Sequence, residues 1–157
     1  MVVWYNLKNM SLITNKKAHF NYEILDTYSA GIELFGYEVK SLKKSQGSLE
    51  GSHVTVRGNE AYVVGMFIPP YQPNNTPKDY DPHRNRKLLL KKNEIIDLAK
   101  VEGMKGLTIV PLSVYNRGDK IKLDIATAKG KKKFDKRETL KKRTADRDIE
   151  RDMKDGQ

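Results

Sequence analysis

Three clusters of lysine and arginine residues are the part of this sequence best suited to a chemical task, which is the binding of phosphate groups. The clusters are Lys40, Lys43 and Lys44; Arg84, Arg86, Lys87, Lys91 and Lys92; and Lys120 with Lys122. Any one cluster is more often a solvated surface than a binding site. Together they predict a polyanionic partner, and about eight to ten phosphate contacts would make the affinity fall steeply with salt.

Aromatic residues lie close in sequence to these cationic clusters and could stack on nucleic-acid bases. They are Phe20, Tyr22, Tyr28, Tyr37, Tyr71, Tyr80 and Phe134. Unpaired RNA bases are commonly held on such rings. Strand aromatics usually pack in a core, and we interpret Tyr22 and Tyr37 in that way. Phe134 differs because no apolar cluster lies near it, which makes it a candidate for contact with a base or a partner.

Catalytic chemistry has little support in the sequence. Asp79, Asp81 and His83 have a spacing that could hold Mg²⁺ or Zn²⁺ in a nuclease, but a proline-rich turn explains the same residues better. The chain has no cysteine, no phosphate-binding Walker loop, no nucleophile elbow and no dinucleotide fingerprint. We therefore predict a binding protein that is not an enzyme and that uses no cofactor and no metal.

The composition favours a nucleic-acid partner over a membrane. The chain has 157 residues, with 30 basic and 20 acidic side chains, a net charge of +10 and a pI near 9.6. A basic balance of this size favours polyanions, most often nucleic acid. No apolar run approaches the roughly 18 residues that span a bilayer, and the first residues do not resemble a secretion signal. We expect a cytoplasmic protein.

The C-terminal segment is the most strongly basic part of the chain. Residues 129–157 carry 12 basic and 7 acidic side chains, the same net charge of +5 that residues 1–128 carry with 18 and 13. Its few large apolar residues cannot offset the ordering entropy, so we predict that it is disordered alone. Favourable pairs such as Glu138 with Lys142 predict that it becomes helical on an anionic surface.

The elements that must position these residues are mostly strands. We predict strands over residues 19–28, 32–42, 53–57, 61–67, 107–115 and 120–128, with a tight turn at Gly58–Asn59. A turn into a short helix is expected at 45–50, and a helix over 88–99 that ends at Gly103. Residues 68–83 hold five of the six prolines and predict a surface loop. Pro111 indicates an edge strand or a bulge.

These elements predict a mainly β fold, an antiparallel barrel of the oligonucleotide-binding type with about six strands and one to three short helices. We divide the chain into an N-terminal extension over residues 1–14, a barrel over 15–128 and a basic tail over 129–157. The pattern does not favour a doubly wound α/β fold, because strands and crossover helices do not alternate.

Several sequence blocks, taken together, resemble the small protein B family, the protein partners of transfer-messenger RNA in bacterial ribosome rescue. The blocks begin with Asn15-Lys16-Lys17-Ala18, Tyr28-Ser29-Ala30-Gly31-Ile32-Glu33-Leu34 and Gly36-Tyr37-Glu38-Val39-Lys40-Ser41-Leu42-Lys43. They continue with Asp81-Pro82-His83-Arg84-Asn85-Arg86-Lys87-Leu88-Leu89-Leu90 and Ala128-Lys129-Gly130-Lys131-Lys132-Lys133-Phe134-Asp135-Lys136-Arg137. The resemblance covers residues 15–153 in order and spacing.

The resemblance implies that the barrel grips the transfer-RNA-like domain of that RNA, and that the tail enters the vacant messenger channel of a stalled ribosome as a helix. The expected RNA-binding residues of the body are Phe20, Ser29, Lys40, Lys43, Arg84, Arg86, Lys87, Leu89 and Lys122. The expected ribosome-binding residues of the tail are Gly130, Lys131, Lys132, Phe134, Asp135, Lys136 and Arg137. Two positions depart from the family pattern, since Ser29 replaces a glutamate and Phe20 a histidine.

The resemblance also implies the partners, which are transfer-messenger RNA and the small-subunit RNA of the ribosome around its decoding region and messenger channel. We expect a monomer that binds the RNA in a 1:1 complex and that does not bind membranes. One alternative is a ribosomal or general single-strand RNA-binding protein with the same barrel. A metal-dependent nuclease that uses Asp79, Asp81 and His83 is the other.

Overall fold

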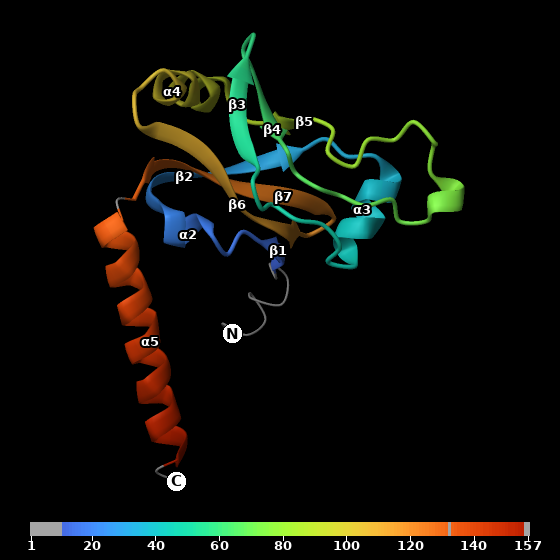
Figure 1. The fold of residues 1–157 in the computed structure, drawn as a ribbon. Helices are drawn as coiled ribbons and strands as arrows, with labels where there is room; N and C mark the ends of the chain where they lie inside the picture. The colour runs from blue at the N-terminus through green and yellow to red at the C-terminus, as the bar shows by residue number, and fades with distance from the viewer. Residues whose placement is uncertain (1–10, 132, 156–157) are drawn as a thin grey trace.

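The computed structural model describes residues 11–131 and 133–155, which form a strand-rich body and one long helix (Figure 1). The strands are β1 (Ser11–Thr14), β2 (Tyr22–Ile32), β3 (His53–Arg57), β4 (Glu60–Val64), β5 (Arg86–Leu89), β6 (Leu107–Arg117) and β7 (Lys120–Gly130). The helices are α2 (Ala18–Asn21), α3 (Gly36–Lys43), α4 (Lys92–Glu102) and α5 (Lys133–Asp155), with a 3₁₀ turn η1 (Pro73–Asn75). The mainly β fold that the sequence predicts is confirmed.

All seven strands belong to one antiparallel sheet, in the order β1-β6-β7-β2-β5-β4-β3. The sheet is strongly curled. Strand β3 at one edge contacts β6, the strand next to the other edge, and α4 contacts both β3 and β6. The curled sheet encloses a core that includes Leu42, Leu49, Met66, Leu123 and Ile125. Closing the sheet in this way shields its edges and leaves the outer face of the strands available for a ligand.

The strand predicted over residues 32–42 is wrong in its second half, which forms helix α3. The Glu38 side chain accepts a hydrogen bond from the Phe35 backbone N–H at 2.8 Å, which satisfies one free donor at the start of the helix. Leu42 and Ser41 are buried on one side of α3, and Lys40 and Lys43 are exposed on the other. Tertiary burial of one helical face therefore outweighs the local preference for extended backbone.

Two predicted helical segments are also wrong. Residues 45–50 form a loop in which Ser48 pairs with Phe67 in an isolated bridge, and Gly47 has a φ of 141°. Residues 86–89 form strand β5, and the helix begins only at Lys92. A run of three leucines fits either a strand or a helix, because a short apolar run has no distinguishing period.

The strand predicted over residues 19–28 is wrong at its start, because Ala18–Asn21 form α2, and β2 continues past residue 28 to Ile32. The remaining elements follow the prediction closely. A tight turn at Gly58–Asn59 joins β3 to β4, with positive φ at both residues, and α4 ends at Gly103. The register of β6 against β7 shifts between Pro111 and Ser113, so Pro111 marks a bulge inside the sheet. Residues 68–83 are irregular apart from η1. Ser11–Thr14, expected in the extension, instead form β1 against β6, while residues 1–10 lie outside the described part.

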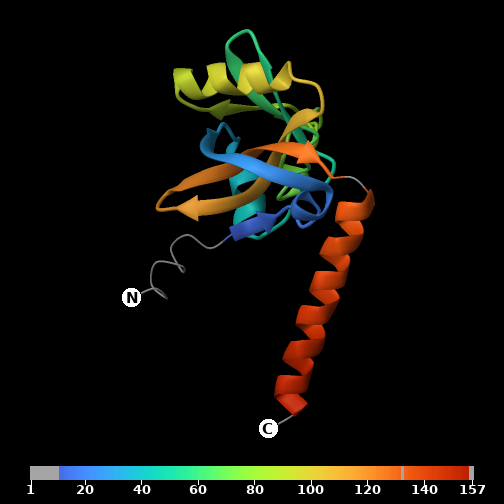
Figure 2. The same ribbon diagram turned by 90° about the vertical axis from the view of Figure 1, so that its left-hand side faces the viewer.

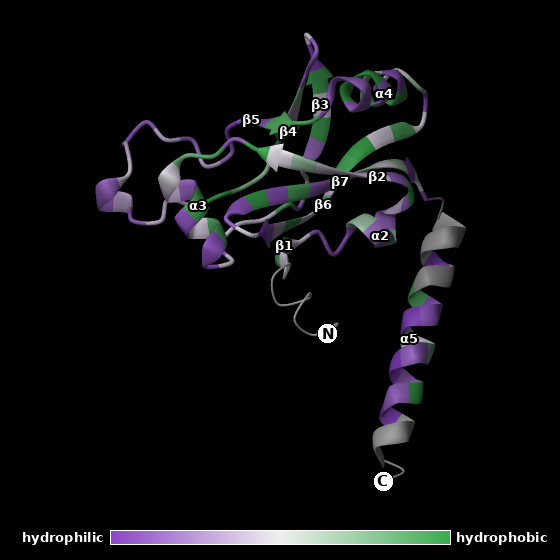
Figure 3. Cartoon of the chain, turned by 180° about the vertical axis from the view of Figure 1, so that it is seen from behind, coloured by the Kyte–Doolittle hydropathy of each residue, from purple (hydrophilic) through white to green (hydrophobic). Residues whose placement is uncertain are grey.

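Helix α5 projects away from the barrel as a single rod in both views (Figures 1 and 2). Figure 3 shows that the described part of α5 is mostly hydrophilic. Two of its hydrophobic residues, Leu140 and Ile149, are about half exposed. Residues 133–155 of the tail form helix α5. The predicted disorder of the tail alone and its folding on an anionic surface stay predictions. No helix in the described ranges has the length and apolar character required to cross a bilayer.

Candidate nucleic-acid interface

The sheet brings Leu89 and Lys122, which are far apart in sequence, onto one face of the barrel. Gly31 of β2 pairs with Leu89 of β5 on one side and with Lys122 of β7 on the other. Directly opposed residues of antiparallel strands project from the same face. The three residues therefore form a row across the outer surface of the sheet. Leu89 is 51% exposed, so its side chain is accessible to a ligand on this face.

A hollow of about 310 Å³ lies at this row and is lined by apolar residues, two lysines and one aspartate. Its lining residues are Gly31, Ile32, Leu34, Val39, Leu89, Asp119, Lys120, Ile121 and Lys122. Gly31 contributes to the shape of the hollow, because a Cβ atom added there would lie 3.1 Å from the Cβ of Leu89. We call this surface, formed by Gly31, Leu89 and Lys122, the sheet-face site.

Strand β5 sorts its four residues between the two faces of the sheet. Lys87 and Leu89 project outward, whereas Arg86 and Leu88 are 0% and 1% exposed. The Lys87 ammonium donates a hydrogen bond to Glu60 at 3.0 Å. That contact raises the pKa of Lys87, and hydrogen bonds from Tyr62 and Lys87 lower the pKa of Glu60. Lys87 therefore lies on the outer face of β5, as expected of an RNA-binding residue, two residues from Leu89 of the sheet-face site.

The structure revises the role expected of Arg86, because its guanidinium is buried and directed into the protein. All five of its N–H groups donate, to the Glu38 carboxylate at 2.7 Å, the carbonyls of Met66, Arg84 and Pro82, and the Tyr80 hydroxyl. None is left for a ligand. Arg86 therefore ties α3 and the 68–83 loop to β5, and does not present its charge at the surface.

Glu38 is the acidic centre of this buried cluster, and sequence reasoning missed it. Its carboxylate also accepts hydrogen bonds from Arg84 and from the Tyr80 hydroxyl at 3.0 Å. Burial alone would raise the pKa of Glu38, but hydrogen bonds from Arg84 and Phe35 and the charge of Arg86 outweigh it and lower the pKa. Burial and Glu38 together raise the pKa of Tyr80 to about 12.

Arg84, Lys40 and Lys43 remain at the surface near this cluster. The Arg84 guanidinium lies over the Phe35 ring, 4.1 Å from its centroid, and also forms an ion pair with the Glu38 carboxylate. Lys40 lies 5.9 Å from the centroid of the Tyr71 ring, and Lys43 is exposed at the end of α3. These cations border the 68–83 loop, so the structure places them on a different element from the sheet-face site.

Ser29 lies on the same face as the sheet-face site, two residues before Gly31 on β2. It is exposed, pairs with Asp124 of β7, and its Oγ lies 2.5 Å from the hydroxyl of Tyr115 on β6. Sequence reasoning missed Tyr115 and Asp124. The period-two alternation of Ser113 and Tyr115, and of Lys122 and Asp124, could have placed all four on one face.

Phe20 lies at the opposite end of the barrel, beside the root of the tail. Tyr22 pairs with Gly130 at one end of β2, and Gly31 pairs with Lys122 at the other. The two ends are about 30 Å apart at about 3.3 Å per residue. The backbone N–H of Lys131 donates to the Asn21 carbonyl at 2.9 Å, and the Lys131 ammonium donates to the His19 carbonyl. Phe20 is therefore part of a tail-side surface.

The tail residues expected to contact the ribosome are only partly described. Gly130 ends β7, and Arg137 is exposed on α5. The side chains of Phe134, Asp135 and Lys136 lie outside the described part, as does Lys132 entirely. Further along α5, the Arg143 guanidinium lies 6.0 Å from the centroid of the Phe20 ring.

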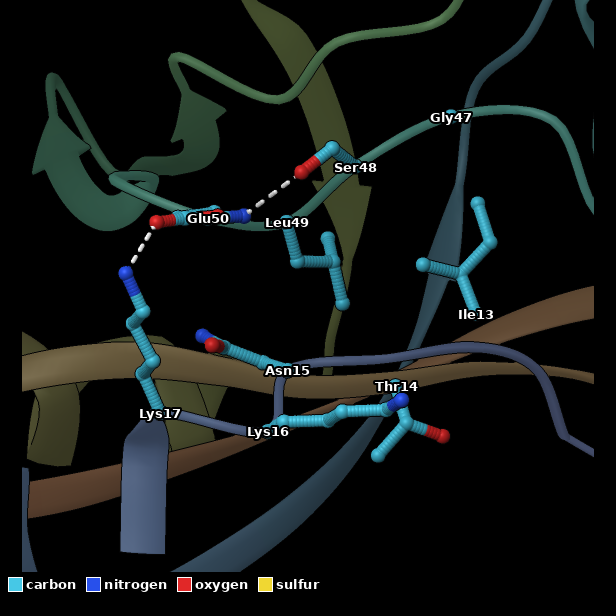
Figure 4. Close-up of a pocket in the computed structure, with 9 residues that line it drawn as sticks. All are labelled: Ile13, Thr14, Asn15, Lys16, Lys17, Gly47, Ser48, Leu49 and Glu50. Atoms are coloured by element: carbon cyan, nitrogen blue, oxygen red, sulfur yellow. Dashed lines mark hydrogen bonds and ion pairs between the residues drawn. The ribbon is translucent and has the colours of Figure 1, made fainter. Parts of the chain in front are cut away.

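A second hollow, of about 220 Å³, lies between residues 13–17 and the 47–50 loop (Figure 4). The Lys17 ammonium donates to the Glu50 carboxylate across it, and the Glu50 N–H donates to Ser48. Asn15 is held against the β6 bulge, because its side chain donates to the Pro111 carbonyl at 2.9 Å. The Asn-Lys-Lys block thus has a structural role in fixing the start of the barrel.

The residues considered for a metal site form a turn. The Asp81 carboxylate accepts a hydrogen bond from the His83 backbone N–H at 2.9 Å, and the His83 ring packs against Phe67 with centroids 5.0 Å apart. Across the described ranges the structure gathers no group of three or more histidine, cysteine, aspartate or glutamate side chains that could hold a metal ion.

Comparison with known proteins decides the family. Residues 12–155 match the family model described as SmpB protein. The chain belongs to the SmpB family. The SsrA-binding protein of Elusimicrobium minutum (strain Pei191) is 49% identical over 141 residues, covering 90% of this chain and 89% of that protein. The SsrA-binding protein of Malacoplasma penetrans (strain HF-2) is 47% identical over 143 residues, covering 91% and 97%.

A solved structure supports the same assignment in three dimensions. A chain from the structure described as "tmRNA-SmpB: a journey to the center of the bacterial ribosome" is 39% identical to this chain, with a TM-score of 0.65. The likeness covers 82% of this chain and 93% of that chain. The predicted membership is therefore confirmed, and the SmpB match extends through the barrel and into α5.

Proposed function

We propose that this SmpB-family chain is an RNA-binding adaptor of trans-translation. In this proposal the barrel binds the transfer-RNA-like domain of transfer-messenger RNA, and the complex is delivered to stalled ribosomes. Relatives that cover nine tenths of the chain are SsrA-binding proteins, and the similar solved chain comes from a structure of tmRNA–SmpB and the ribosome. Action on the ribosome supports a cytoplasmic location. We propose that the protein works by binding and not by catalysis, as a monomer in a 1:1 complex with the RNA.

The observation that carries the proposal is the sheet-face site. A folded RNA presents phosphates and sugar or base surfaces together, and this site offers an exposed leucine and a lysine across a glycine. Ser29 and Lys87 extend the polar and cationic surface around it, and Arg84, beside the 68–83 loop, is assigned to its periphery. Lys40 and Lys43 on α3 are assigned to its periphery, and Arg86 to the support of the surface from below.

The tail is proposed to act separately, by entering the empty messenger channel as a helix. Its support is the position of Phe20 and the root of α5 at the far end of β2 from the sheet-face site. A rod rich in cationic side chains suits a channel walled by RNA. Gly130, Lys131, Lys132, Phe134, Asp135, Lys136 and Arg137 are the residues assigned to this contact.

The test separates the two surfaces. Lys122→Glu should weaken binding of the transfer-RNA-like RNA, while Lys100→Glu on α4 makes the same charge change on an exposed residue outside the site and should have a smaller effect. Truncation after Lys133 should leave RNA binding nearly intact and abolish ribosome rescue. Loss of RNA affinity on truncation would contradict the division of labour. Recovery of a mixed RNA population with the purified protein would favour a general RNA-binding protein instead.

A further inference from the structure

Three polar side chains from three neighbouring strands meet beside the sheet-face site. Ser29 of β2 pairs with Asp124 of β7, which in turn pairs with Ser113 of β6. The Tyr115 hydroxyl reaches from β6 to the Ser29 Oγ at 2.5 Å, although β7 lies between their strands. The Tyr115 side chain therefore crosses over β7, next to Asp124. We call Ser29, Tyr115 and Asp124 the acceptor cluster.

The chemistry of the three groups limits what they can offer to a ligand. The Ser29 and Tyr115 hydroxyls share one hydrogen bond, in which either oxygen can be the donor. The register places Asp124 directly opposite Ser29, and an ionised carboxylate can only accept. Burial raises the pKa of the Asp124 carboxyl, and the hydrogen bond from Tyr115 opposes that rise.

One hydroxyl hydrogen is thus used inside the cluster. Toward solvent lie the exposed Ser29 Oγ and the half-buried Asp124 carboxylate, whose oxygens accept hydrogen bonds. Such a surface repels a phosphate, which carries negative charge and offers only acceptors. The same surface can accept a hydrogen bond from the RNA. The hydrogen-bond donors of RNA are the amino and imino groups of its bases and the ribose 2′-hydroxyl.

We propose that the acceptor cluster reads a hydrogen-bond donor of the bound RNA, with Asp124 as the principal acceptor. The inference rests on the proposed function. Lys122 projects from the same face two residues away on β7 and supplies the cation for a neighbouring phosphate. The face is therefore divided, with a phosphate at Lys122, an apolar contact at Leu89 and a donor at the acceptor cluster.

The sign of one substitution tests the proposal. Asp124→Asn removes a negative charge from a basic RNA-binding face, so a carboxylate that merely repelled RNA would give tighter binding when replaced. If Asp124 accepts from an RNA donor, the substitution weakens binding of the transfer-RNA-like RNA about tenfold, within the usual range for one specific contact. Asp97→Asn on α4 makes the same charge change at an exposed residue and serves as the control.

The salt dependence distinguishes this contact from a phosphate contact. Asp124→Asn should leave the slope of log affinity against log salt unchanged, whereas Lys122→Ala should reduce it by about 0.7 to 0.9. Tyr115→Phe keeps the ring and removes the bridging hydroxyl, and it should weaken binding in the same way as Asp124→Asn. Thermal unfolding of each full-length variant verifies that the barrel is intact.

Substituted RNAs identify which donor is read. Transfer-RNA-like RNAs with single 2′-deoxy positions, or with single inosines in place of guanosines, are titrated with the wild-type chain and with Asp124→Asn. A modification at the RNA position that Asp124 contacts should weaken binding by the wild-type chain but not binding by Asp124→Asn. Wild-type binding with equal or tighter binding by Asp124→Asn would overturn this inference alone. Failure of the wild-type chain to bind the RNA would overturn the proposed function itself.

Discussion

Glu38→Gln is the substitution whose consequence the structure defines most sharply. Glu38 and Arg86 are both 0% exposed and bonded to each other, and the change removes the carboxylate that is bonded to the buried Arg86. The Arg86 guanidinium would remain buried with its charge uncompensated. Breaking one partner of a buried ion pair costs about 3–5 kcal/mol. Because glutamine keeps one acceptor oxygen, we expect about 3 kcal/mol of lost unfolding free energy.

Urea unfolding of the full-length chain measures this loss, since urea leaves the charge interactions unscreened. A domain of this size has about 5–15 kcal/mol of stability, so the shift in midpoint is large. Glu60→Gln is the matched control, because Glu60 makes an exposed ion pair with Lys87 and its loss should shift the midpoint far less. Equal shifts for the two variants would refute the reasoning.

The pH dependence gives an independent reading of the same contact. The pKa of Glu38 is lowered from 4.5 in the folded protein, so its ionisation stabilises the fold fully above about pH 4.5. This contribution is lost as the pH falls through the folded pKa. The difference in unfolding free energy between wild type and Glu38→Gln should therefore narrow below pH 4.5, and a constant difference would contradict the assignment.

Two glycine substitutions test the shape of the barrel. Gly31→Ala places a Cβ 3.1 Å from the Cβ of Leu89. It should displace the Leu89 side chain and weaken RNA binding, with little change in the urea midpoint. Unchanged RNA affinity would show that Gly31 does not shape the site. Gly47 has a φ of 141°, and a Cβ added there would lie 2.8 Å from the Phe67 carbonyl oxygen and 2.9 Å from Ile13. Gly47→Ala should therefore lower the unfolding free energy by about 1–3 kcal/mol, measured by urea unfolding. Wild-type stability of this variant would contradict the prediction.

Sequence reasoning was strongest where the local code is strong. The β3–β4 turn at Gly58–Asn59, the last hairpin, the bulge at Pro111 and the proline-rich loop all have backbone requirements that few residues satisfy. It was weakest at α3 and β5. There the apolar residues fit a helix or a strand equally well, and only burial against the rest of the barrel chose between them.

The sequence by itself determined the class of partner and the two-part organisation, because net charge, apolar content and the absence of cysteine are properties of composition. It also named Leu89 and Lys122, through a resemblance that the family match supports. Only the tertiary structure decided which cations face outward. Strand parity directs Lys87 to the surface and Arg86 inward to Glu38, and the register of β2 between β5 and β7 joins Leu89 to Lys122. Such pairings arise from contacts between distant segments, which no local pattern encodes.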